Sequence, residues 1–398
     1  MRLGILTTHP VQYYVPLYRA LARELDLEVF FSHRQTAAGQ AAAGFGVGFE
    51  WDVPLLDGYA HTFLDNRARR PSTDTFAGTH TPEIGRLIRQ GKFDAFLVQG
   101  WYTRSLWQAM IACWASGTPL LIRGDSHLGT PRSGVRRAVK EVLYRSFIPR
   151  YDGYLVVGEQ AREYLLYYGA DPARMDFTPH FVDAEFFRTH AARADRAALR
   201  AELGSGPDTL WLLFVGKLLP EKRPADLISA AAALRAQGRD VRVAYVGAGP
   251  LAADLGTAAT VQDVPIRRLG FKNQTELPAY YAAADLLVLP SDSETWGLVV
   301  NEAFACGTPA VVSDAVGCRP DLITDADPGR TGAAFPVGDP AALAAAVERV
   351  IPHLGTDALA RALAARSDTY SLQASVDGTV RAVERVSTLV PQPAPVVA

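Results

Sequence analysis

Two glutamates, Glu294 and Glu302, lie on either side of a glycine in the segment 291–309. The apolar run at 285–290 precedes them and predicts a fully buried strand. Gly297 is suited to open a helix, so Glu294 falls on the preceding loop and Glu302 on the second helical turn. Carboxylates in these two places could hold the hydroxyl groups of a ligand that binds at the start of the helix.

The same segment predicts a strand–helix–strand unit, because a second apolar run follows at 310–312. Such units bind ligands at the carboxyl ends of their strands. Backbone N–H groups from Gly297 to Val299 would face an anion there, and Glu302 would lie about 7 Å further along the helix. This arrangement suits a nucleoside diphosphate and the hydroxyls of its ribose.

Two lysines follow another predicted strand. The run 210–215 ends at Gly216, where the missing side chain allows close backbone approach. Lys217 and Lys222 lie in the loop before a predicted helix at 225–236. Two cations there suit a diphosphate leaving group, on which negative charge builds as a sugar departs. The alternative is that both lysines are solvated loop residues without a ligand. Their position at the expected ligand-binding edge favours a role in binding a diphosphate.

The composition is that of an ordinary soluble globular protein. Its 398 residues predict two or three domains. Of these residues 48% are hydrophobic and 21% charged, and the net charge of −2 gives no general attraction to nucleic acid or an anionic membrane. The first residues predict a strand and no signal peptide, and no apolar run reaches transmembrane length. The protein is therefore expected to be cytoplasmic.

Metal and disulfide chemistry are not indicated. Three cysteines are too few for a disulfide framework. Cys306 and Cys318 lack the spacing and histidine partners of a zinc site, and no Asp-x-Asp motif falls at an expected ligand-binding position. No metal site is therefore predicted.

Short apolar runs alternate with longer amphipathic segments, a pattern typical of α/β proteins with parallel sheets. The predicted strands are 3–6, 27–31, 95–98, 119–122 and 153–157 in the first half, and 210–215, 241–246, 266–269, 286–289 and 310–312 in the second. Two such sets predict two doubly wound domains. The linker is expected within 183–206, and the proline-rich end at 390–398 is expected to be disordered.

Two motifs together resemble those of the retaining glycosyltransferases of family 4. They are VGKLLPEK at 215–222 and SETWGLVVNEAFACGTP at 293–309. The similarity covers the second domain, and length and strand order extend it along the chain. It implies the GT-B fold, with two Rossmann-like domains and an active site in the cleft between them. The implied divisions are 1–185 for binding the acceptor, 186–370 for binding the nucleotide-sugar, and 371–398 for a helix that packs back on the first domain and a tail.

The resemblance implies roles for residues on the donor side. Lys217 and Lys222 would bind the donor diphosphate, Glu294 would lie by the donor sugar, and Glu302 would hold the ribose hydroxyls. Other expected donor contacts are Gly216, the backbone of Gly297, Leu298 and Val299, and Phe271 and Lys272, which would bracket the nucleobase largely through main chain.

Three features depart from the family pattern. Lys217 stands where arginine is usual, which keeps the charge but loses the bidentate fork. Trp296 replaces phenylalanine and is expected to narrow the sugar pocket. His180 and Phe181 replace the asparagine and glycine of an interdomain motif, so the hinge geometry stays open.

Polar and aromatic residues follow predicted strands of the first domain. His9 and Gln12 stand in place of the Gly-Gly loop of many relatives and are candidate substrate contacts, with a core or capping role as the alternative. Asp125 and His127 are candidates to contact the donor sugar, although Asp125 could instead cap the next helix. Trp101 could stack on a sugar or anchor the core.

The segment 132–150 is basic and amphipathic, with six lysines and arginines against one acid. It could make a peripheral contact with an anionic membrane. A solvated basic face is the more common role of such a segment and is favoured here, because large exposed apolar residues are not evident.

The resemblance implies a metal-independent, hexosyltransferase-like enzyme without a cofactor. It would move a sugar, with retention, from a nucleoside-diphosphate sugar to a hydroxyl of a glycan, lipid-linked or natural-product acceptor. A GT-B epimerase or a sugar phosphorylase is the alternative, because either would use the same cleft. A non-catalytic sugar-binding protein would be expected to have lost these lysines or glutamates. No side chain specifies the donor base, the sugar or the acceptor.

Overall fold

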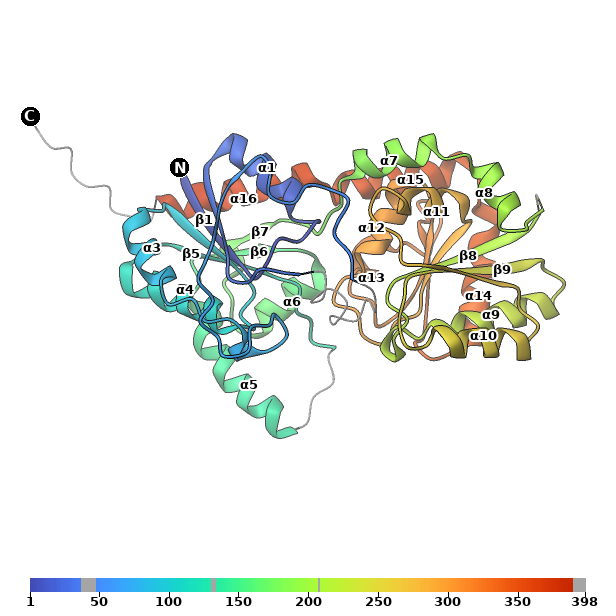
Figure 1. Cartoon of the computed structure of the whole chain (residues 1–398), viewed down its shortest axis with the longest axis horizontal. Helices are drawn as coiled ribbons and strands as arrows, with labels where there is room; N and C mark the ends of the chain where they lie inside the picture. Colours follow the sequence, from blue (N-terminus) through green and yellow to red (C-terminus); the bar gives the residue numbers. More distant parts are fainter. Residues whose placement is uncertain (37–47, 130–133, 207, 389–398) are drawn as a thin grey trace, which may run out of the picture. The chain divides into compact units, whose positions relative to one another are not determined.

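The chain divides into two compact units, each with its own parallel sheet (Figure 1). The computed structural model describes residues 1–36, 48–129, 134–206 and 208–388. The first unit comprises residues 1–35, 54–179 and those from 372 onward, and the second comprises residues 36–53 and 180–371.

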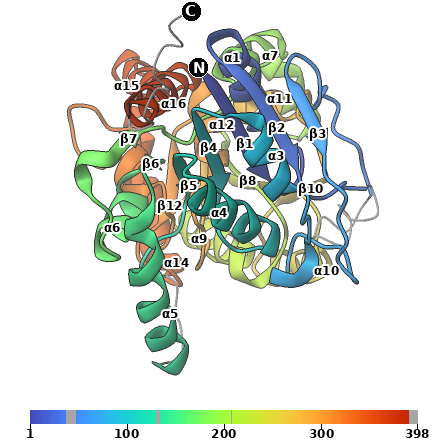
Figure 2. The ribbon, with the colours of Figure 1, turned by 90° about the vertical axis from the view of Figure 1, so that its left-hand side faces the viewer.

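The first unit is built on a seven-stranded sheet with the order β3-β2-β1-β4-β5-β6-β7. The strands are β1 (Arg2–Thr7), β2 (Asp26–Phe31), β3 (Ala60–Phe63), β4 (Ala95–Gln99), β5 (Leu120–Gly124), β6 (Gly153–Val156) and β7 (Met175–Phe177). All residues of β4 are buried, as expected where helices cover both faces of a parallel sheet. Strands β3 and β7 are the partly exposed edges of this sheet (Figure 2).

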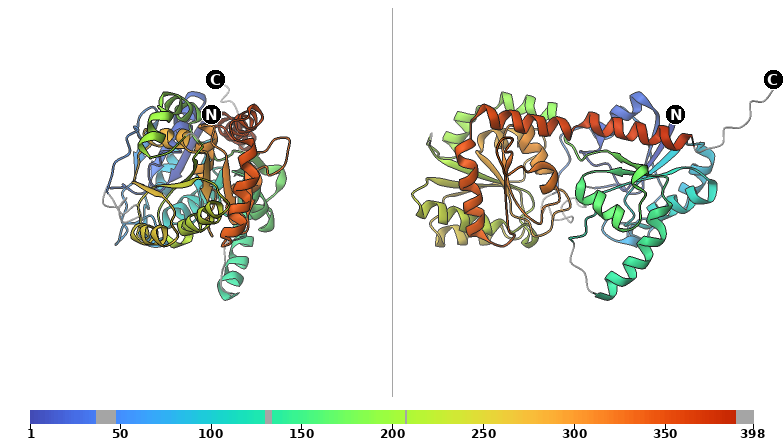
Figure 3. Two further views of the ribbon diagram at one scale, coloured as in Figure 1. Left: turned by 90° about the vertical axis from the view of Figure 1, so that its right-hand side faces the viewer. Right: turned by 180° about the vertical axis from the view of Figure 1, so that it is seen from behind.

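Helices from both ends of the sequence surround this sheet. They are α1 (Val15–Glu24), α3 (Ile84–Gly91), α4 (Arg104–Ser116), α5 (Gly134–Phe147), α6 (Glu159–Tyr167) and α16 (Leu372–Ser387). Helix α16 packs against α1, β6 and β7 (Figure 3). Arg385 on α16 donates to the Asp176 carboxylate at 2.5 Å and to the Asp152 carbonyl at 3.2 Å. The last described helix is thus part of the first unit.

The basic segment predicted at 132–150 largely coincides with α5, which extends away from its sheet in Figure 2. Residues 132 and 133 lie outside the described residues. Val142 and Leu143 on this helix are exposed, and Arg145 pairs with Glu141 at 2.7 Å. Among the described residues, no helix combines the length and apolar character needed to cross a membrane.

The second unit is built on a six-stranded sheet with the order β10-β9-β8-β11-β12-β13. The strands are β8 (Leu210–Val215), β9 (Val241–Val246), β10 (Ile266–Gly270), β11 (Leu286–Leu289), β12 (Ala310–Ser313) and β13 (Gly332–Phe335). Every residue of β8, β11 and β12 is buried. These buried central strands carry, at their carboxyl ends, the loops in which the candidate site residues of this unit lie.

The helices of the second unit include the segment in which a linker was expected. They are α7 (Ala184–Arg193), α8 (Arg196–Glu202), α9 (Pro224–Ala236), α10 (Ala252–Val261), α11 (Leu277–Ala283), α12 (Leu298–Ala305), α13 (Arg319–Leu322), α14 (Pro340–Val350) and α15 (Asp357–Thr369). Asp183 caps α7 by accepting from the Phe186 N–H at 3.0 Å. Both α7 and α8 pack on α11, so most of 183–206 is ordered helix.

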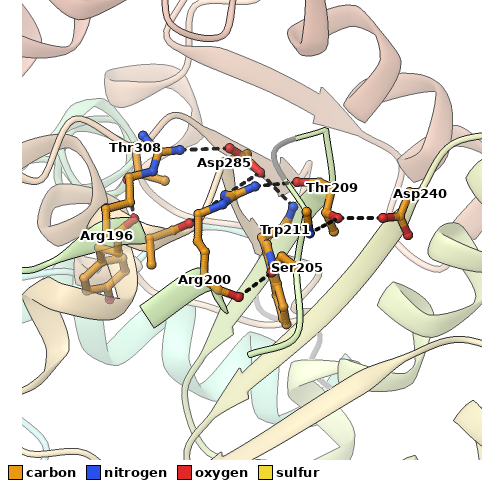
Figure 4. A network of polar contacts seen from close by, with 11 residues as sticks. Arg196, Arg200, Ser205, Thr209, Trp211, Asp240, Asp285 and Thr308 are labelled. Atoms are coloured by element: carbon orange, nitrogen blue, oxygen red, sulfur yellow. Dashed lines mark hydrogen bonds and ion pairs between the residues drawn. The ribbon is translucent and has the colours of Figure 1, made fainter. Parts of the chain in front are cut away.

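A polar network attaches α8 to the amino ends of β8 and β11 (Figure 4). Asp285 accepts hydrogen bonds from Arg200 at 3.0 Å and from the Trp211 N–H at 2.8 Å, and it pairs with Arg196 at 3.0 Å. Arg200 also donates to the carbonyls of Ala283 and Thr209, at 2.9 and 2.5 Å. One largely buried carboxylate therefore organises this corner of the second unit.

The predicted fold class, two doubly wound parallel-sheet domains, is confirmed. Strands β8, β9 and β11 have the predicted bounds. Three strands were not predicted: β3 and β7 are short, partly exposed edge strands, and β13 consists mostly of glycine and alanine. None of the three contains a run of large apolar residues, which is the pattern that a buried strand leaves in a sequence. The end at 390–398 lies outside the described residues.

Candidate functional site: the carboxyl edge of the second sheet

Four loops lie side by side at the carboxyl edge of the second sheet, after β10, β9, β8 and β11. Backbone hydrogen bonds join the first three: the Gly216 N–H donates to the Val246 carbonyl at 3.0 Å, and the Gly247 N–H to the Gly270 carbonyl at 2.8 Å. The Leu218 N–H donates to the Ala248 carbonyl at 2.9 Å. The edge is therefore a continuous surface of backbone.

Glycine is required at the centre of this surface. Gly247 has φ +140°, and a Cβ atom there would lie 1.9 Å from the Gly216 carbonyl oxygen. A side chain would push the two loops apart, because no real contact is that short. Gly216, Gly247 and Gly270, at the ends of the three joined strands, thus form a glycine surface on which the loops pack closely.

Two of the predicted donor-binding residues contact each other. Lys222 ends the short 3₁₀ helix Pro220–Lys222 and forms an ion pair with Glu294, which lies in the loop after β11. Their side chains are 21% and 20% exposed, so the pair is reachable from solvent but held in place. The Asp292 N–H also donates to the Glu221 carbonyl at 2.9 Å and joins the two loops. The other lysine, Lys217, is half-buried directly after Gly216.

The start of α12 lies next to this ion pair in the sequence. Gly297 has φ +99° and immediately precedes the helix, so a residue with a side chain would be strained there. The first turn of a helix leaves N–H groups without partners inside the helix, and here they belong to Leu298 and Val299. Hydrogen bonds from Gly317 to the Glu294 carbonyl and from Cys318 to the Trp296 carbonyl, both 2.9 Å, fix the loop before the helix.

Glu302 occupies a different environment from Glu294. It is fully buried, with 0% of its surface exposed, and it accepts a hydrogen bond from the Tyr281 hydroxyl at 2.5 Å. In this arrangement the carboxylate joins α12 to α11, and a ribose would reach it only after a local rearrangement.

Trp296 is also buried, with 4% exposure. Its indole N–H donates to Asn301 at 2.9 Å, and its ring packs 5.2 Å from that of His180 and 6.0 Å from that of Tyr370. The Asn301 amide in turn donates to the His180 carbonyl at 3.4 Å. Trp296 therefore supports the beginning of the second unit's main segment.

The predicted nucleobase loop follows β10. Phe271 is half-buried and stacks with Phe49, the ring centroids being 4.1 Å apart. Lys272 pairs with Glu276 at 3.1 Å and lies 5.4 Å from the Tyr280 ring centre. The lysine charge is thus engaged within the loop and the start of α11.

The first unit has its own polar edge at the carboxyl ends of β1, β2 and β4. His9 Nδ1 lies 3.0 Å from the Thr8 hydroxyl, which lies 3.4 Å from the Tyr102 hydroxyl. The His33 N–H donates to the Thr8 carbonyl at 2.7 Å. Burial and, secondarily, the nearby His33 lower the pKa of His9 from 6.5 to about 4, although Asp74 opposes the shift. His9 is therefore a neutral imidazole at physiological pH. Gln12 is half-buried in the turn that follows.

The end of β5 contains a buried arginine. Arg123 is 3% exposed, donates to the carbonyls of Thr178 and Pro179 at 3.3 and 3.1 Å, and lies 5.3 Å from the Tyr14 ring centre. Asp125 is half-buried and His127 buried nearby in the sequence. Helix α5 begins nine residues after Asp125, at Gly134, so Asp125 does not cap it.

Trp101 lies in the hydrophobic core of the first unit. Its indole N–H donates to the Tyr144 hydroxyl at 3.0 Å, and its ring stacks with that of Tyr164 at 6.1 Å. With 9% exposure it offers little surface for a sugar. Trp101 therefore has the core-anchoring role that the sequence analysis gave as the alternative to stacking on a sugar.

The sequence did not indicate Tyr281, Thr8 or Phe49 as site residues. Tyr281 contacts Glu302 from another helix, Thr8 approaches Tyr102 across 94 positions, and Phe49 contacts Phe271 from the other half of the chain. Within the described ranges, no group of three or more histidine, cysteine or acidic residues could hold a metal ion.

A cavity of about 200 Å³ lies at the opposite edge of the second sheet, at the amino ends of β8 and β9. Arg200, Thr209, Asp240 and Asp285 contribute to its lining. These side chains already serve the network that attaches α8, so this cavity belongs to the structural framework of the unit.

Comparison with known proteins links both units to one class. Residues 195–354 match the family of glycosyl transferases group 1, and residues 10–180 match the glycosyl transferase 4-like domain. A D-inositol 3-phosphate glycosyltransferase of Catenulispora acidiphila is 35% identical over 240 residues, which cover 54% of this chain and 54% of that protein. The chain spans about half the length of the curated relatives it matches.

Solved structures share the fold along the whole chain. A glycosyltransferase of Rickettsia africae has a TM-score of 0.72 at 13% identity, with 97% of this chain and 98% of that chain covered. HepE of Anabaena, solved with UDP and glucose, has a TM-score of 0.69 at 17% identity, with 96% and 99% covered. The fold and the two family matches together define a GT-B protein. The chain belongs to the GT-B glycosyltransferases, with a 4-like domain followed by a group 1 domain.

Proposed function

We propose that this chain is a retaining, metal-independent glycosyltransferase that moves a hexose from a nucleoside-diphosphate sugar to a hydroxyl acceptor. The observation that carries the proposal is the Lys222–Glu294 ion pair beside a glycine surface and the start of α12. Cation, backbone donors and carboxylate are the groups needed for a diphosphate that is joined to a sugar.

The ion pair suggests how the donor binds. A diphosphate at this edge would compete with Glu294 for Lys222. Glu294, once released, could accept a hydrogen bond from a hydroxyl of the donor sugar. Binding of the diphosphate to Lys222 and of the sugar to Glu294 would then be coupled, because both require the ion pair between these two residues to open.

The same groups would assist the reaction. As the bond between sugar and phosphate breaks, negative charge develops on the leaving diphosphate. Lys217, Lys222 and the N–H groups at the start of α12 would stabilise that charge. In this mechanism the leaving phosphate assists deprotonation of the acceptor on the same face of the sugar, so retention requires no separate protein base.

The names of the similar proteins supply the first substrates to test. HepE was solved with UDP and glucose, which supports UDP-glucose as the first donor. We propose that Asp125 and His127, which follow β5, contact the donor sugar. For the acceptor side we propose the polar edge of the first unit, with His9. Gln12 is a further candidate there. A cytoplasmic location belongs to the same proposal. A peripheral membrane contact through α5 is added to it, because the exposed Val142 and Leu143 provide the large apolar side chains that the sequence analysis did not expect there.

Incubation of the purified protein with UDP-, GDP-, dTDP- and ADP-sugars, followed by mass spectrometry, tests the function. Release of one nucleoside diphosphate would identify the donor before the acceptor is known. The anomeric configuration of the product, read by NMR, would test retention, and chelator treatment would test metal independence. Isomerised donor without transfer, or sugar phosphate formed only with added phosphate, would contradict the proposal.

Replacement of Lys222 by alanine should lower the rate of transfer by about 10²–10³-fold, the usual effect of removing one group that stabilises transition-state charge. Arg239→Ala is a matched control, because Arg239 is an exposed cation paired with Glu348. Circular dichroism should show both variants folded. Wild-type turnover in Lys222→Ala would contradict the assignment of the site.

A further inference from the structure

Residues 48–53 belong to the second unit, although the residues flanking the segment 36–53 belong to the first. This short described segment contains two aromatic residues, Phe49 and Trp51, neither of which has a role in the mechanism proposed above. It follows β2, whereas every residue proposed to bind the diphosphate or the base lies in the second half of the chain. Its position on the second unit is fixed by specific contacts.

Two polar contacts join the segment to the loop after β10. The Asn273 side-chain amide donates to the Glu50 carbonyl at 2.8 Å. The Thr275 N–H donates to the Asp52 carboxylate at 3.1 Å, and the Thr275 hydroxyl donates to the same oxygen. The contacts span 223 positions of sequence. They place residues 49–52 against the loop that carries Phe271.

The aromatic residues form a cluster there. Phe49 lies 4.1 Å from Phe271 with the rings inclined by 32°, and Trp51 meets the edge of Phe49 at 4.8 Å and 87°. All three residues are half-buried and keep part of their surface exposed. An exposed aromatic surface held by polar contacts is suited to stacking with a flat ligand.

The cluster lies at a suitable distance from the lysines. Strand β10 is two places from β8 in the sheet, with β9 between them, and adjacent strands are about 4.8 Å apart, so the loops are separated by roughly 10 Å. That distance fits the separation of base and phosphates in a nucleoside diphosphate lying across the glycine surface. The ligand would therefore present its base to the cluster.

The spacing of the two phenylalanines limits how a base can bind. A base inserted between them would need two contact layers of about 3.5 Å each, or about 7 Å in all, whereas their centres are 4.1 Å apart. The pair must therefore act as a single wall. We propose that Phe49 and Phe271 together form the aromatic wall of the nucleobase subsite, and that residues 48–53 complete the donor site.

This inference rests on the proposed function, and calorimetric titration can separate the two. The titrants are UDP, GDP, ADP and inorganic pyrophosphate, and the proteins are wild type, Phe49→Ala, Phe49→Tyr and Phe76→Ala. Phe76 is a matched control, because it is 54% exposed and lies in the first unit. Pyrophosphate has no base, so its affinity reports on the diphosphate-binding groups around the lysines. The affinity of a nucleoside diphosphate reports on these groups and on the proposed nucleobase subsite together.

Phe49→Ala should weaken binding of the preferred nucleoside diphosphate by about tenfold, which is within the range for loss of one aromatic stacking partner. Pyrophosphate binding should not change, Phe49→Tyr should restore nucleotide affinity, and Phe76→Ala should resemble wild type. Unchanged or tighter nucleotide binding by folded Phe49→Ala would overturn the inference while leaving the lysine site intact. If wild type binds neither nucleotide nor pyrophosphate, the proposed function fails and this inference fails with it.

If Phe49→Ala does not fold, Asn273→Ala provides a second route. This change removes the hydrogen bond to the Glu50 carbonyl and a local one that the Asn273 side chain accepts from the Gln274 N–H at 3.0 Å. It should loosen the segment without altering an aromatic ring. It should weaken nucleotide binding by less than Phe49→Ala and leave pyrophosphate binding unchanged. Wild-type nucleotide affinity in a double variant that combines Asn273→Ala with Asp52→Ala would contradict the inference.

Discussion

Glu294 and Glu302 are of the same residue type eight positions apart, yet their surroundings give them different chemistry. Glu294 is partly exposed and faces a lysine, so it can exchange partners with an incoming ligand. Glu302 has no exposed surface and is held by a tyrosine. A buried carboxylate that loses its hydrogen-bond donor is costly, so Glu302 must stabilise α12 whatever else it does.

His9 should make the stability of the first unit depend on pH. Its pKa is about 4 in the folded chain and about 6.5 when unfolded, so between these values the unfolded chain binds the extra proton. The free energy of unfolding should therefore fall as pH decreases from about 6.5 to 4, by at most about 3 kcal/mol. Denaturant unfolding of wild type and His9→Gln across this range would measure the effect.

The variant should lose most of that pH dependence, because glutamine does not titrate. His61→Gln is a suitable control, since His61 lies on the edge strand β3. Equal slopes of unfolding free energy against pH for wild type and His9→Gln would show that His9 is not the group responsible.

At the scale of elements, α8 is attached to the second sheet through one carboxylate. Asp285→Ala would leave Arg200, whose side chain is 13% exposed, without its main partner, and it would remove the acceptor of the Trp211 N–H. Breaking a largely buried pair in this way costs about 3–5 kcal/mol. The second unit should therefore unfold at a lower denaturant concentration.

Asp368→Ala is the matched control for that change. Asp368 pairs with Arg188 through side chains that are 71% and 50% exposed, and such pairs contribute about 1 kcal/mol or less. Equal destabilisation by the two changes would mean that the network around Asp285 does not hold α8.

At the scale of the whole molecule, α16 should determine the stability of the first unit and not that of the second. Val386 on α16 is fully buried, so Val386→Asp would place an unpaired charge in the core at a cost of several kcal/mol. Hydrogen exchange should then speed up in β6, β7 and α1, which pack against α16. Helices α9 and α14 of the second unit serve as the internal control. Equal acceleration in both units would contradict the separate cores.

The sequence predicts the fold where both faces of a strand are buried. The run LWLLFV of β8 is apolar throughout and was located to the residue, because a short run without polar positions is typical of a strand covered on both faces. Strand β7, with the sequence MDF and partial exposure, leaves no comparable pattern. Its place in the sheet depends on pairing with β6 and on packing against α16, and α16 lies at the far end of the described chain.

The candidate site is predictable to a similar extent. Lys222 and Glu294 are evident from residue type and from their positions at strand ends, although not as partners of each other. The burial of Glu302 depends on Tyr281, which lies on another helix. The contact of Phe49 with Phe271 depends on a loop that returns across more than two hundred positions, and no local pattern encodes it.

The position of α16 also affects how the protein folds during synthesis. The first unit lacks the helix that covers β6 and β7 until residue 387 has left the ribosome. The main segment of the second unit, residues 180–371, is complete before that helix emerges. Although domains usually fold in the order of their synthesis, we expect the unit that begins the chain to be the last to reach its final structure.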